Sequence, residues 1–291
     1  MATGTGPTTR RRLLGAQLRR LRAESGLTLE AAGEAAGCSR ATVNRYEGAS
    51  GPVRWVVVDA LCRAYGANDT ERQAAVDLAR NAKVEGWWTS LSPSVLPEWM
   101  APLVTLENEA EEEWIFANAY VPGLLQTRAY AEAVHRAAEM RAGEDELARM
   151  IDVRMRRQEV LSRPNAPHLW VILDEAVISR QVGGPRVMAE QLEHLNALGR
   201  TNRVTLQVLP FSAGAHAAET TSFIIIRGPA AELDVVHIGN LTGALYLEKP
   251  AELDRYRTVF EYLRSQALDT ERSAEIIGRA SSAFAAMTTQ E

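Results

Sequence analysis

Three leucines near the start of the chain, Leu14, Leu18 and Leu21, recur at the spacing of an α-helix. Arginines lie between and beside them. An apolar stripe flanked by charge predicts an amphipathic helix from Leu13 to Glu24. Gly26 follows as a stop signal, because glycine readily adopts the left-handed backbone that ends many helices.

The helical pattern continues to residue 85. Thr28 can cap the segment LEAAGEAA, and Ser39 can cap a third helix that runs to about Glu47, since hydroxyls accept hydrogen bonds from the first turn of a helix. Two further helical segments follow, VRWVVVDALCRAY and TERQAAVDLARNAKVEG. We therefore predict an N-terminal all-α domain of five helices over residues 13–85, preceded by a flexible basic arm over residues 1–12.

A different pattern begins after a connector. Residues 86–103 contain three tryptophans and three prolines without a clear period, and we interpret them as an ordered link. From Leu106 we expect three helices, the first of them LENEAEEEWIFANA, and then β-branched runs typical of strands. The runs are HLWVILD, VTLQVLP, SFIIIR, DVVHIG and GALYLE.

One more helix is expected between the first two of these runs, and two helices are expected at the end of the chain. This mixture predicts an α+β domain over residues 104–285, with a small mixed or antiparallel sheet. Residues 286–291 are expected to form a tail.

Charge is distributed unevenly along the 291 residues, whose net charge is −5. Residues 1–85 hold 13 basic side chains against 9 acidic ones, whereas the remainder holds 19 against 28. A basic segment joined to an acidic body suggests that only the N-terminal part meets an anionic partner, such as a nucleic acid.

Composition argues against several classes of protein. Hydrophobic residues make up 46% and charged residues 24%, which is typical of a folded globular protein. No apolar run approaches the roughly 20 residues that span a bilayer, and no secretory signal is evident, so we expect a cytoplasmic protein without a membrane partner. Cys38 and Cys62 are expected to be small thiols rather than a disulfide, with a redox switch as the alternative.

The second and third predicted helices are joined by a short, glycine-containing turn, which is the arrangement of a helix-turn-helix. A helix that enters the major groove of DNA, roughly 12 Å wide, must be short and polar on one face. Arg40 and Asn44 share a face at a spacing of four residues, and Arg45 lies in the adjacent row. Arginine suits guanine and asparagine suits adenine, so the segment 39–47 is predicted to recognise bases in double-stranded DNA. The alternative is an ordinary solvated helix face.

The stretch LGAQLRRLRAESGLTLEAAGEAAGCSRATVNRYEG resembles the Xre, or phage-repressor, type of helix-turn-helix over residues 13–80. Later segments are similar to the C-terminal domain of actinomycete WhiJ-like regulators, a group often described as antitoxin-like. They are VPGLLQT, RMRRQEVLSRP, LDEAVISRQVGG, MAEQLEHL, VTLQVLPFSAGAHAA and LTGALYLEKP. The resemblance implies a sequence-specific transcriptional regulator whose DNA binding is modulated by a small partner protein encoded nearby.

The resemblance also implies roles for single residues. Base contacts are implied at the four positions Arg40, Ala41, Asn44 and Arg45. An ion pair is implied between Arg22 on the first helix and Glu47 at the end of the third.

The resemblance implies phosphate contacts at Thr28 and Thr42, and the short hydroxyl side chains of Ser39 and Thr42 are themselves suited to phosphates. The chain departs from the repressor pattern at Leu29, where such proteins often place a glutamine that holds a phosphate. We therefore expect the basic arm, with Arg10, Arg11 and Arg12, to supply the missing contact.

Three hypotheses compete for residues 104–285: an interaction and dimerisation domain, a small-molecule sensor, and an enzyme. The enzyme hypothesis is the weakest, because no G-x-S-x-G, phosphate-cradling glycine loop, H-E-x-x-H or C-x-x-C motif occurs. The five histidines show no ligand spacing, so no metal or cofactor is expected.

Two segments of this half leave both the interaction and the sensor hypothesis open. The first is the loop LPFSAGAHAA, which either lines a pocket or simply connects two strands. The second is the acidic segment ENEAEEEW, which either forms a solvated helix face or attracts a basic partner. We also expect a homodimer, since one module of this kind recognises too few bases for useful specificity.

Overall fold

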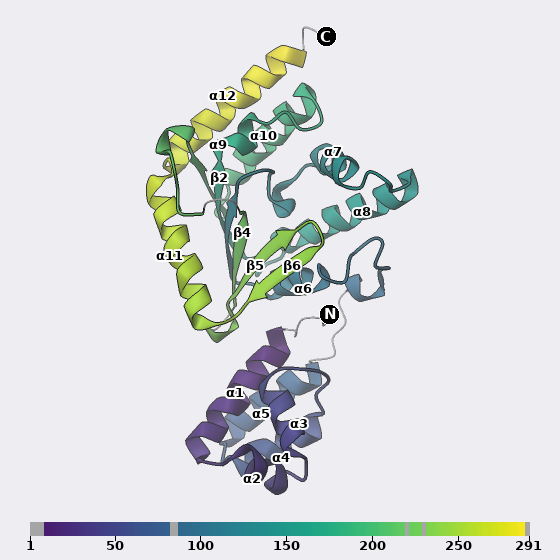
Figure 1. Ribbon diagram of the computed structural model, residues 1–291, viewed down its shortest axis with the longest axis vertical. Coiled ribbons are helices and arrows are strands. Elements are labelled where there is room, and N and C mark those ends of the chain that lie inside the picture. Colours follow the sequence, from purple (N-terminus) through teal and green to yellow (C-terminus); the bar gives the residue numbers. More distant parts are fainter. Residues whose placement is uncertain (1–8, 82–86, 219–220, 229–230, 289–291) are drawn as a thin grey trace. The chain divides into compact units, whose positions relative to one another are not determined.

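The computed structural model describes residues 9–81, 87–218, 221–228 and 231–288 (Figure 1). The chain divides into two compact units, which are described separately. The structure confirms the predicted fold class, with a helical N-terminal domain and a C-terminal α+β domain.

The N-terminal domain consists, within the described residues, of five helices (Figure 1). They are α1 (Thr9–Ser25), α2 (Leu29–Ala35), α3 (Arg40–Glu47), α4 (Trp55–Ala64) and α5 (Asp69–Asn81). The leucines that form the apolar stripe of α1 are buried among side chains of the other helices, including Val43, Tyr46, Leu61 and Ala75. The core of this domain is therefore built by the pattern that predicted its helices.

The first helix begins at Thr9 and not at Leu13. The part of the predicted basic arm that lies among the described residues is thus helical, while residues 1–8 lie outside the described ranges. The run of arginines and leucines at this end favours the continuation, since both residue types have high helix propensity and no breaker separates them. The expectation of a flexible arm is wrong for residues 9–12.

The helix expected from Leu106 is also corrected. Helix α6 (Ala101–Glu109) begins inside the predicted connector, after the short turn η1 (Trp87–Ser90), and ends before the glutamate run does. The next residues form strand β1 (Glu112–Ala117), which lies between two other strands. Side chains of β1 enter the apolar clusters on both faces of the sheet, Ile115 and Ala117 on one face and Phe116 on the other, so this part of the strand lacks the alternation that marks a half-exposed strand.

Strand β1 is the third strand of a six-stranded sheet in the described part of the C-terminal domain, with the order β3-β2-β1-β4-β5-β6. The strands that the sequence predicted are β2 (His168–Asp174), β3 (Val204–Leu209), β4 (Phe223–Arg227), β5 (Val235–Asn240) and β6 (Gly243–Leu247). Strands β1, β2 and β3 run parallel, whereas β4, β5 and β6 continue the sheet in antiparallel pairings. The sheet is therefore mixed.

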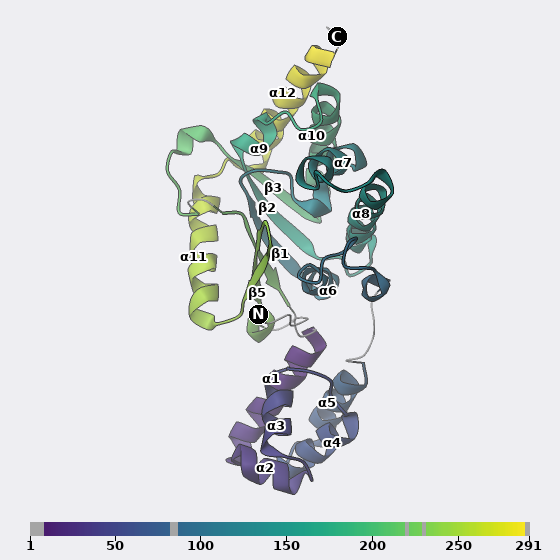
Figure 2. The same ribbon diagram turned by 45° about the vertical axis from the view of Figure 1, so that its right-hand side comes forward.

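Helices cover both faces of this sheet (Figure 2). The long helices are α7 (Arg128–Ala138), α8 (Glu144–Arg157), α10 (Pro185–Gly199), α11 (Pro250–Gln266) and α12 (Thr270–Thr288). Helix α11 packs on one face through Phe260 and Leu263, and α7, α10 and α12 bury side chains such as Tyr130 and Leu192 on the other. Short helical segments complete the domain: η2 (Gly123–Leu125), η3 (Gln158–Ser162), α9 (Glu175–Ser179) and η4 (Phe211–Ala213). The segment η5 (Ala231–Leu233) and helix α6 belong to the same compact unit as the five N-terminal helices.

Within the described ranges, every helix is too short or too polar to span a lipid bilayer. Cys38 and Cys62 are free thiols, the first half-buried and the second fully buried. Burial raises the pKa of the Cys62 thiol to about 11, so this side chain is held in its protonated, unreactive form at neutral pH.

Candidate nucleic-acid interface

Two hydroxyl side chains define where α2 and α3 begin. The Thr28 oxygen accepts a hydrogen bond from the Ala31 amide at 3.2 Å, and the Ser39 oxygen accepts one from the Thr42 amide, also at 3.2 Å. Gly37, with a φ of +66°, makes the sharp change of direction between the two helices. The predicted helix-turn-helix geometry is thus produced by three local signals.

Two glycines set how closely the helices around α3 approach one another. A Cβ atom at Gly33 would lie 2.7 Å from the Cys38 carbonyl oxygen, and one at Gly15 would lie 2.7 Å from the Glu47 carbonyl oxygen. Both contacts would be with backbone, which cannot rotate away. Only glycine therefore allows α2 and α1 to pack at these distances against the start and the end of α3.

The inward face of α3 is fixed in the core. Val43, Tyr46 and Glu47 are buried, with Val43 fully inaccessible to solvent. The Tyr46 hydroxyl also accepts a hydrogen bond from the Arg54 amide at 3.0 Å, which ties the loop after α3 to the helix. Because one face is anchored, the opposite face has a defined orientation.

That opposite face carries the four residues expected to contact bases. Arg40, Ala41, Asn44 and Arg45 are all exposed. Arg40 forms an ion pair with Glu30 of α2 at 3.0 Å, and both side chains are more than half exposed. A pair of this kind is worth only about 0–1 kcal/mol, so Arg40 can exchange Glu30 for another acceptor at little cost.

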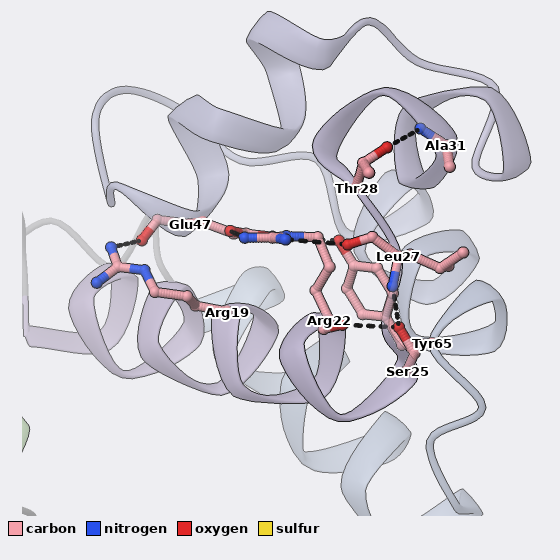
Figure 3. A network of polar contacts seen from close by, with 8 residues as sticks. All are labelled: Arg19, Arg22, Ser25, Leu27, Thr28, Ala31, Glu47 and Tyr65. Carbon is pink, nitrogen blue, oxygen red and sulfur yellow. Dashed lines mark hydrogen bonds and ion pairs between the residues drawn. The ribbon is translucent and has the colours of Figure 1, made fainter.

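Arg22 and Glu47 are brought together behind the exposed face, and Figure 3 shows their contacts. The Arg22 guanidinium donates to both carboxylate oxygens of Glu47, at 2.7 and 3.0 Å, and to the Leu27 carbonyl at 3.0 Å. The hydrogen bonds to Glu47 raise the pKa of Arg22. Burial, followed by the charge of Glu47, raises the pKa of the neighbouring Tyr65, whose hydroxyl therefore stays protonated and donates to the same carboxylate.

The hydroxyl residues expected to contact phosphates lie at the starts of the two helices. Thr28 and Ser39 are exposed and Thr42 is half-buried. Ser39 and Thr42 also share a hydrogen bond of 3.0 Å between their hydroxyl oxygens. The Thr28 hydroxyl accepts in its capping bond, so its own proton remains available to a phosphate oxygen.

The three arginines of the first turns of α1 differ in their surroundings. Arg11 is half-buried, and its guanidinium donates to the Gly51 carbonyl across 3.4 Å. Arg12 is 7% exposed and donates to the Leu233 carbonyl at 2.8 Å. The side chain of Arg10 lies outside the described residues. The Arg12 guanidinium is therefore buried against a backbone acceptor, and its expected phosphate contact stays a prediction.

Leu29, which stands in the place of a phosphate-binding glutamine, is half-buried and packs against the core of the domain. Its side chain contributes to the stability of α2. The departure from the repressor pattern therefore substitutes an apolar core contact for a polar surface contact.

Three further residues of this domain were not singled out by sequence reasoning. Glu30 holds Arg40, Arg19 donates to the Glu47 carbonyl at 2.8 Å, and Arg54 stands exposed at the start of α4. The last carbonyl groups of a helix have no hydrogen-bond partner within the helix, and Arg19 provides one for a carbonyl at the end of α3. The spacing of Glu30 and Arg40 across a turn gives no periodic signal, so only the folded arrangement identifies the pair.

Comparison with known families agrees with this geometry. A helix-turn-helix domain model matches residues 13–75, the part that contains most of α1, all of α2–α4 and about half of α5. A second model, described as a domain of unknown function (DUF5753), matches residues 100–279. The chain belongs to the DUF5753 family. Its N-terminal helix-turn-helix marks it as a DNA-binding regulator. No curated protein and no solved structure matches the chain.

The DUF5753 domain holds the histidines that sequence analysis noted. His168 bonds to Thr205, and His216 lies 3.8 Å from the Asp174 carboxylate. Asp174 also caps α9 by accepting from the Ala176 amide. The described residues contain no group of three or more histidine, cysteine or acidic side chains that could hold a metal ion.

The glutamate run spans the end of α6 and the start of β1, and it is not a solvated helix face. Glu107 and Glu113 are buried, and Glu112 pairs with Arg227 on the neighbouring strand β4. The segment 209–218, a second open alternative of the sequence, contains η4 between β3 and β4, with Phe211 largely exposed. The segment thus connects the two strands, and whether it also lines a binding site stays an open alternative.

Proposed function

We propose that the chain is a sequence-specific transcriptional regulator that recognises an operator in double-stranded DNA by placing α3 in the major groove. The observation that supports this is the division of α3 into two faces. Val43, Tyr46 and Glu47 hold one face in the core, and the other presents two arginines and an asparagine without neighbours that bury them. Such a face can reach base edges without any change in the fold.

The proposed contacts follow from the chemistry of each side chain. Arg40 and Arg45 can donate two hydrogen bonds to guanine, Asn44 can pair with adenine, and Ala41 allows close approach to a thymine methyl group. Thr28, Ser39 and Thr42, together with Arg10 and Arg11, are proposed to contact phosphates and fix the register. Arg40 would exchange its ion pair with Glu30 for a base.

We further propose that the protein acts as a homodimer in the cytoplasm, as an Xre-type member of the WhiJ-like, antitoxin-like group. A two-fold operator presents the same bases twice, so two copies double the number of recognised positions. A small partner protein encoded nearby would modulate DNA binding through the DUF5753 domain. The excess of acidic side chains in residues 86–291 supports separate roles for the two domains. DNA repels an acidic domain, which therefore remains available to bind a protein.

We regard the chain as a regulator rather than an enzyme, because its helix-turn-helix accounts for one domain and no catalytic motif occurs in the other. A second candidate for the DUF5753 domain is the sensing of a small molecule. A cleft in that domain, described below, favours it.

The test of DNA recognition starts from an operator selected from random sequences with the purified protein. Arg45→Ala is expected to weaken operator binding about tenfold to a hundredfold and to relax preference at one base position. Arg11→Ala is expected to weaken binding to all DNA sequences alike. It should also reduce the dependence of DNA affinity on salt concentration by the equivalent of about one phosphate contact. Arg63→Ala, an exposed arginine of α4 that pairs with Asp59, is the control for loss of charge alone. Operator binding by Arg45→Ala that equals that of the parent protein would exclude this placement of α3.

The dimer and the partner are tested separately. Sedimentation of the full chain should give twice the mass of one copy. Co-expression with the product of a neighbouring small gene should give a complex that survives purification and shifts the operator affinity. If the full chain is a monomer and does not bind that product, both proposals are wrong. The proposed DNA contacts would not be affected by this result.

A further inference from the structure

The DUF5753 domain contains a cleft of about 220 Å³ on one face of its sheet. Ile115 of β1 lies opposite Ile224 of β4, and Ile224 lies opposite His237 of β5, so the three side chains form one row across the same face. Ala117 and Gly239 stand two residues further along their strands, on that same face, and also line the cleft. Because these two residues are small, the space above them is not filled by their own side chains.

One wall of the cleft is formed by the segment around Tyr120, Pro122 and Gly123, which is held by the side chains of one buried and one half-buried glutamine. The Gln126 side chain donates to the Val121 carbonyl at 2.7 Å, and the Gln158 side chain donates to the Gly123 carbonyl at 2.9 Å. Side-chain hydrogen bonds of this kind fix a loop that has no strand or long helix of its own. The wall is therefore preformed, as in most small-molecule sites.

His237 is the polar group of this cleft that lacks a partner. Its side chain is 7% exposed, and its buried Nε2 atom has no hydrogen-bond partner among the described residues. A buried polar atom without a partner costs roughly 1–3 kcal/mol in general, so native proteins rarely retain one without a reason. A bound molecule that supplies the missing hydrogen bond is such a reason.

The surroundings of His237 restrict what that molecule can be. Burial, followed by the positive charge of Arg157, lowers the pKa of His237 to about 4, so the ring is neutral at physiological pH. The same positive charge disfavours a cationic ligand. A hydroxyl group can both donate and accept, and therefore satisfies Nε2 in either neutral tautomer of the ring.

We propose that this cleft binds a small uncharged molecule, about the size of one substituted six-membered ring, that carries a hydroxyl group for Nε2 of His237. The size follows from the volume, since an apolar cavity of about 150 Å³ holds benzene, and drug-sized ligands need roughly 300 Å³ or more. The apolar floor of Ile115, Ala117 and Ile224 would cover the ring. This site is independent of DNA recognition, and its test requires no DNA.

The test uses phenol as the probe and toluene as its apolar match, titrated into the full chain and followed by NMR of the histidine side-chain nitrogens. Phenol should bind saturably, shift the Nε2 resonance of His237, and bind about three- to tenfold more tightly than toluene, which lacks the hydroxyl. His237→Phe should keep the shape of the site and abolish the preference for phenol.

Gly239→Leu should fill the cleft and remove the binding of both probes. A Cβ atom there would lie 3.6 Å from Cε1 of His237, an ordinary contact, so this variant is expected to fold. His194→Phe, on α10 away from the cleft, is the control and should bind phenol like the parent protein. Absence of saturable phenol binding, phenol binding that survives Gly239→Leu, or a preference for phenol that survives His237→Phe would each overturn the proposal.

Discussion

Arg22 of α1 and Glu47 of α3 form a two-pronged ion pair, with Nε to Oε1 at 2.7 Å and Nη2 to Oε2 at 3.0 Å. Glu47 is 5% exposed and Arg22 is 22% exposed, so the pair is largely shielded from water. The Tyr65 hydroxyl at the end of α4 donates to the same carboxylate at 3.3 Å. One carboxylate thus ties three helices together behind the face that we propose contacts DNA.

Removal of this carboxylate is expected to destabilise the N-terminal domain strongly. Glu47→Ala leaves the shielded Arg22 guanidinium and the Tyr65 hydroxyl without their acceptor, and we expect a loss of about 2–4 kcal/mol in the free energy of unfolding. Glu24→Ala, which breaks an exposed pair with Arg20, is the control and should cost about 0–1 kcal/mol. Urea unfolding followed by circular dichroism measures both. Equal losses in the two variants would show that burial of the pair contributes nothing.

The close packing at Gly33 gives a second prediction. Alanine normally stabilises a helix relative to glycine by about 0.5–1 kcal/mol. At Gly33 the added Cβ would meet the backbone of Cys38 and Ser39, so we expect Gly33→Ala to destabilise the domain by about 1–3 kcal/mol and to weaken operator binding. Gly278→Ala in α12, where the nearest atom would lie at an ordinary 3.5 Å, should be neutral or stabilising. A Gly33→Ala protein with an unchanged melting temperature would contradict this account of the turn.

The ion pair between Glu30 and Arg40 gives a third prediction. Glu30 neutralises an arginine that we propose contacts a base, and it places a negative charge near the phosphates. Glu30→Gln should therefore raise operator affinity at low salt, by about threefold to tenfold, and the gain should shrink as salt screens the charge. Glu34→Gln, an exposed residue of the same helix, tests whether charge alone is responsible. A gain in Glu34→Gln equal to that in Glu30→Gln would assign the effect to net charge.

The burial of His237 predicts a pH dependence of stability. Its pKa in the folded protein is about 4, below the ordinary value near 6.5, so between these pH values the unfolded chain binds a proton that the folded protein does not. The free energy of unfolding should therefore fall as pH decreases from about 6.5 toward 4. The contribution of this one residue should reach about 1–2 kcal/mol at pH 5.

The groups that face His237 are Arg157, whose charge favours the neutral ring, and Tyr246, whose ring centroid lies 5.2 Å away. His135, with a pKa also lowered to about 4 by burial and by arginine charges, adds a similar effect in parent and variant alike. We therefore compare urea unfolding of the parent and of His237→Phe at pH 7 and pH 5. If the free energy of unfolding falls equally in the two proteins between pH 7 and pH 5, His237 is not the cause of the pH dependence.

The local elements of this protein were accessible from its sequence because their signals lie within a few residues. Thr28 and Ser39 cap the helices that their positions predicted. The five β-branched runs form five of the six strands in the described sheet. Hydrophobic period and capping chemistry act over a single turn, so no distant partner is needed to recognise them.

Strand β1 shows where that reasoning fails. Its glutamates resemble a charged helix face, yet Glu113 is fully buried and the strand pairs with residues more than 50 positions away. The intrinsic preference of such a segment is weak, and the two neighbouring strands determine its state. Arg12 is a similar case, since an arginine in a basic run is expected at the surface and is here buried against a distant carbonyl.

The sequence by itself determined the helix-turn-helix, the side chains on its exposed face, and the α+β class of the second domain. Only the tertiary structure decided that Arg40 is held by Glu30, that β1 lies inside the sheet, and that Ile115, Ile224 and His237 share one face of a cleft. The physical reason is the range of the interactions. Capping and helical periodicity are local properties of a chain, whereas strand register and the burial of a polar atom depend on which distant segments the folded chain brings together.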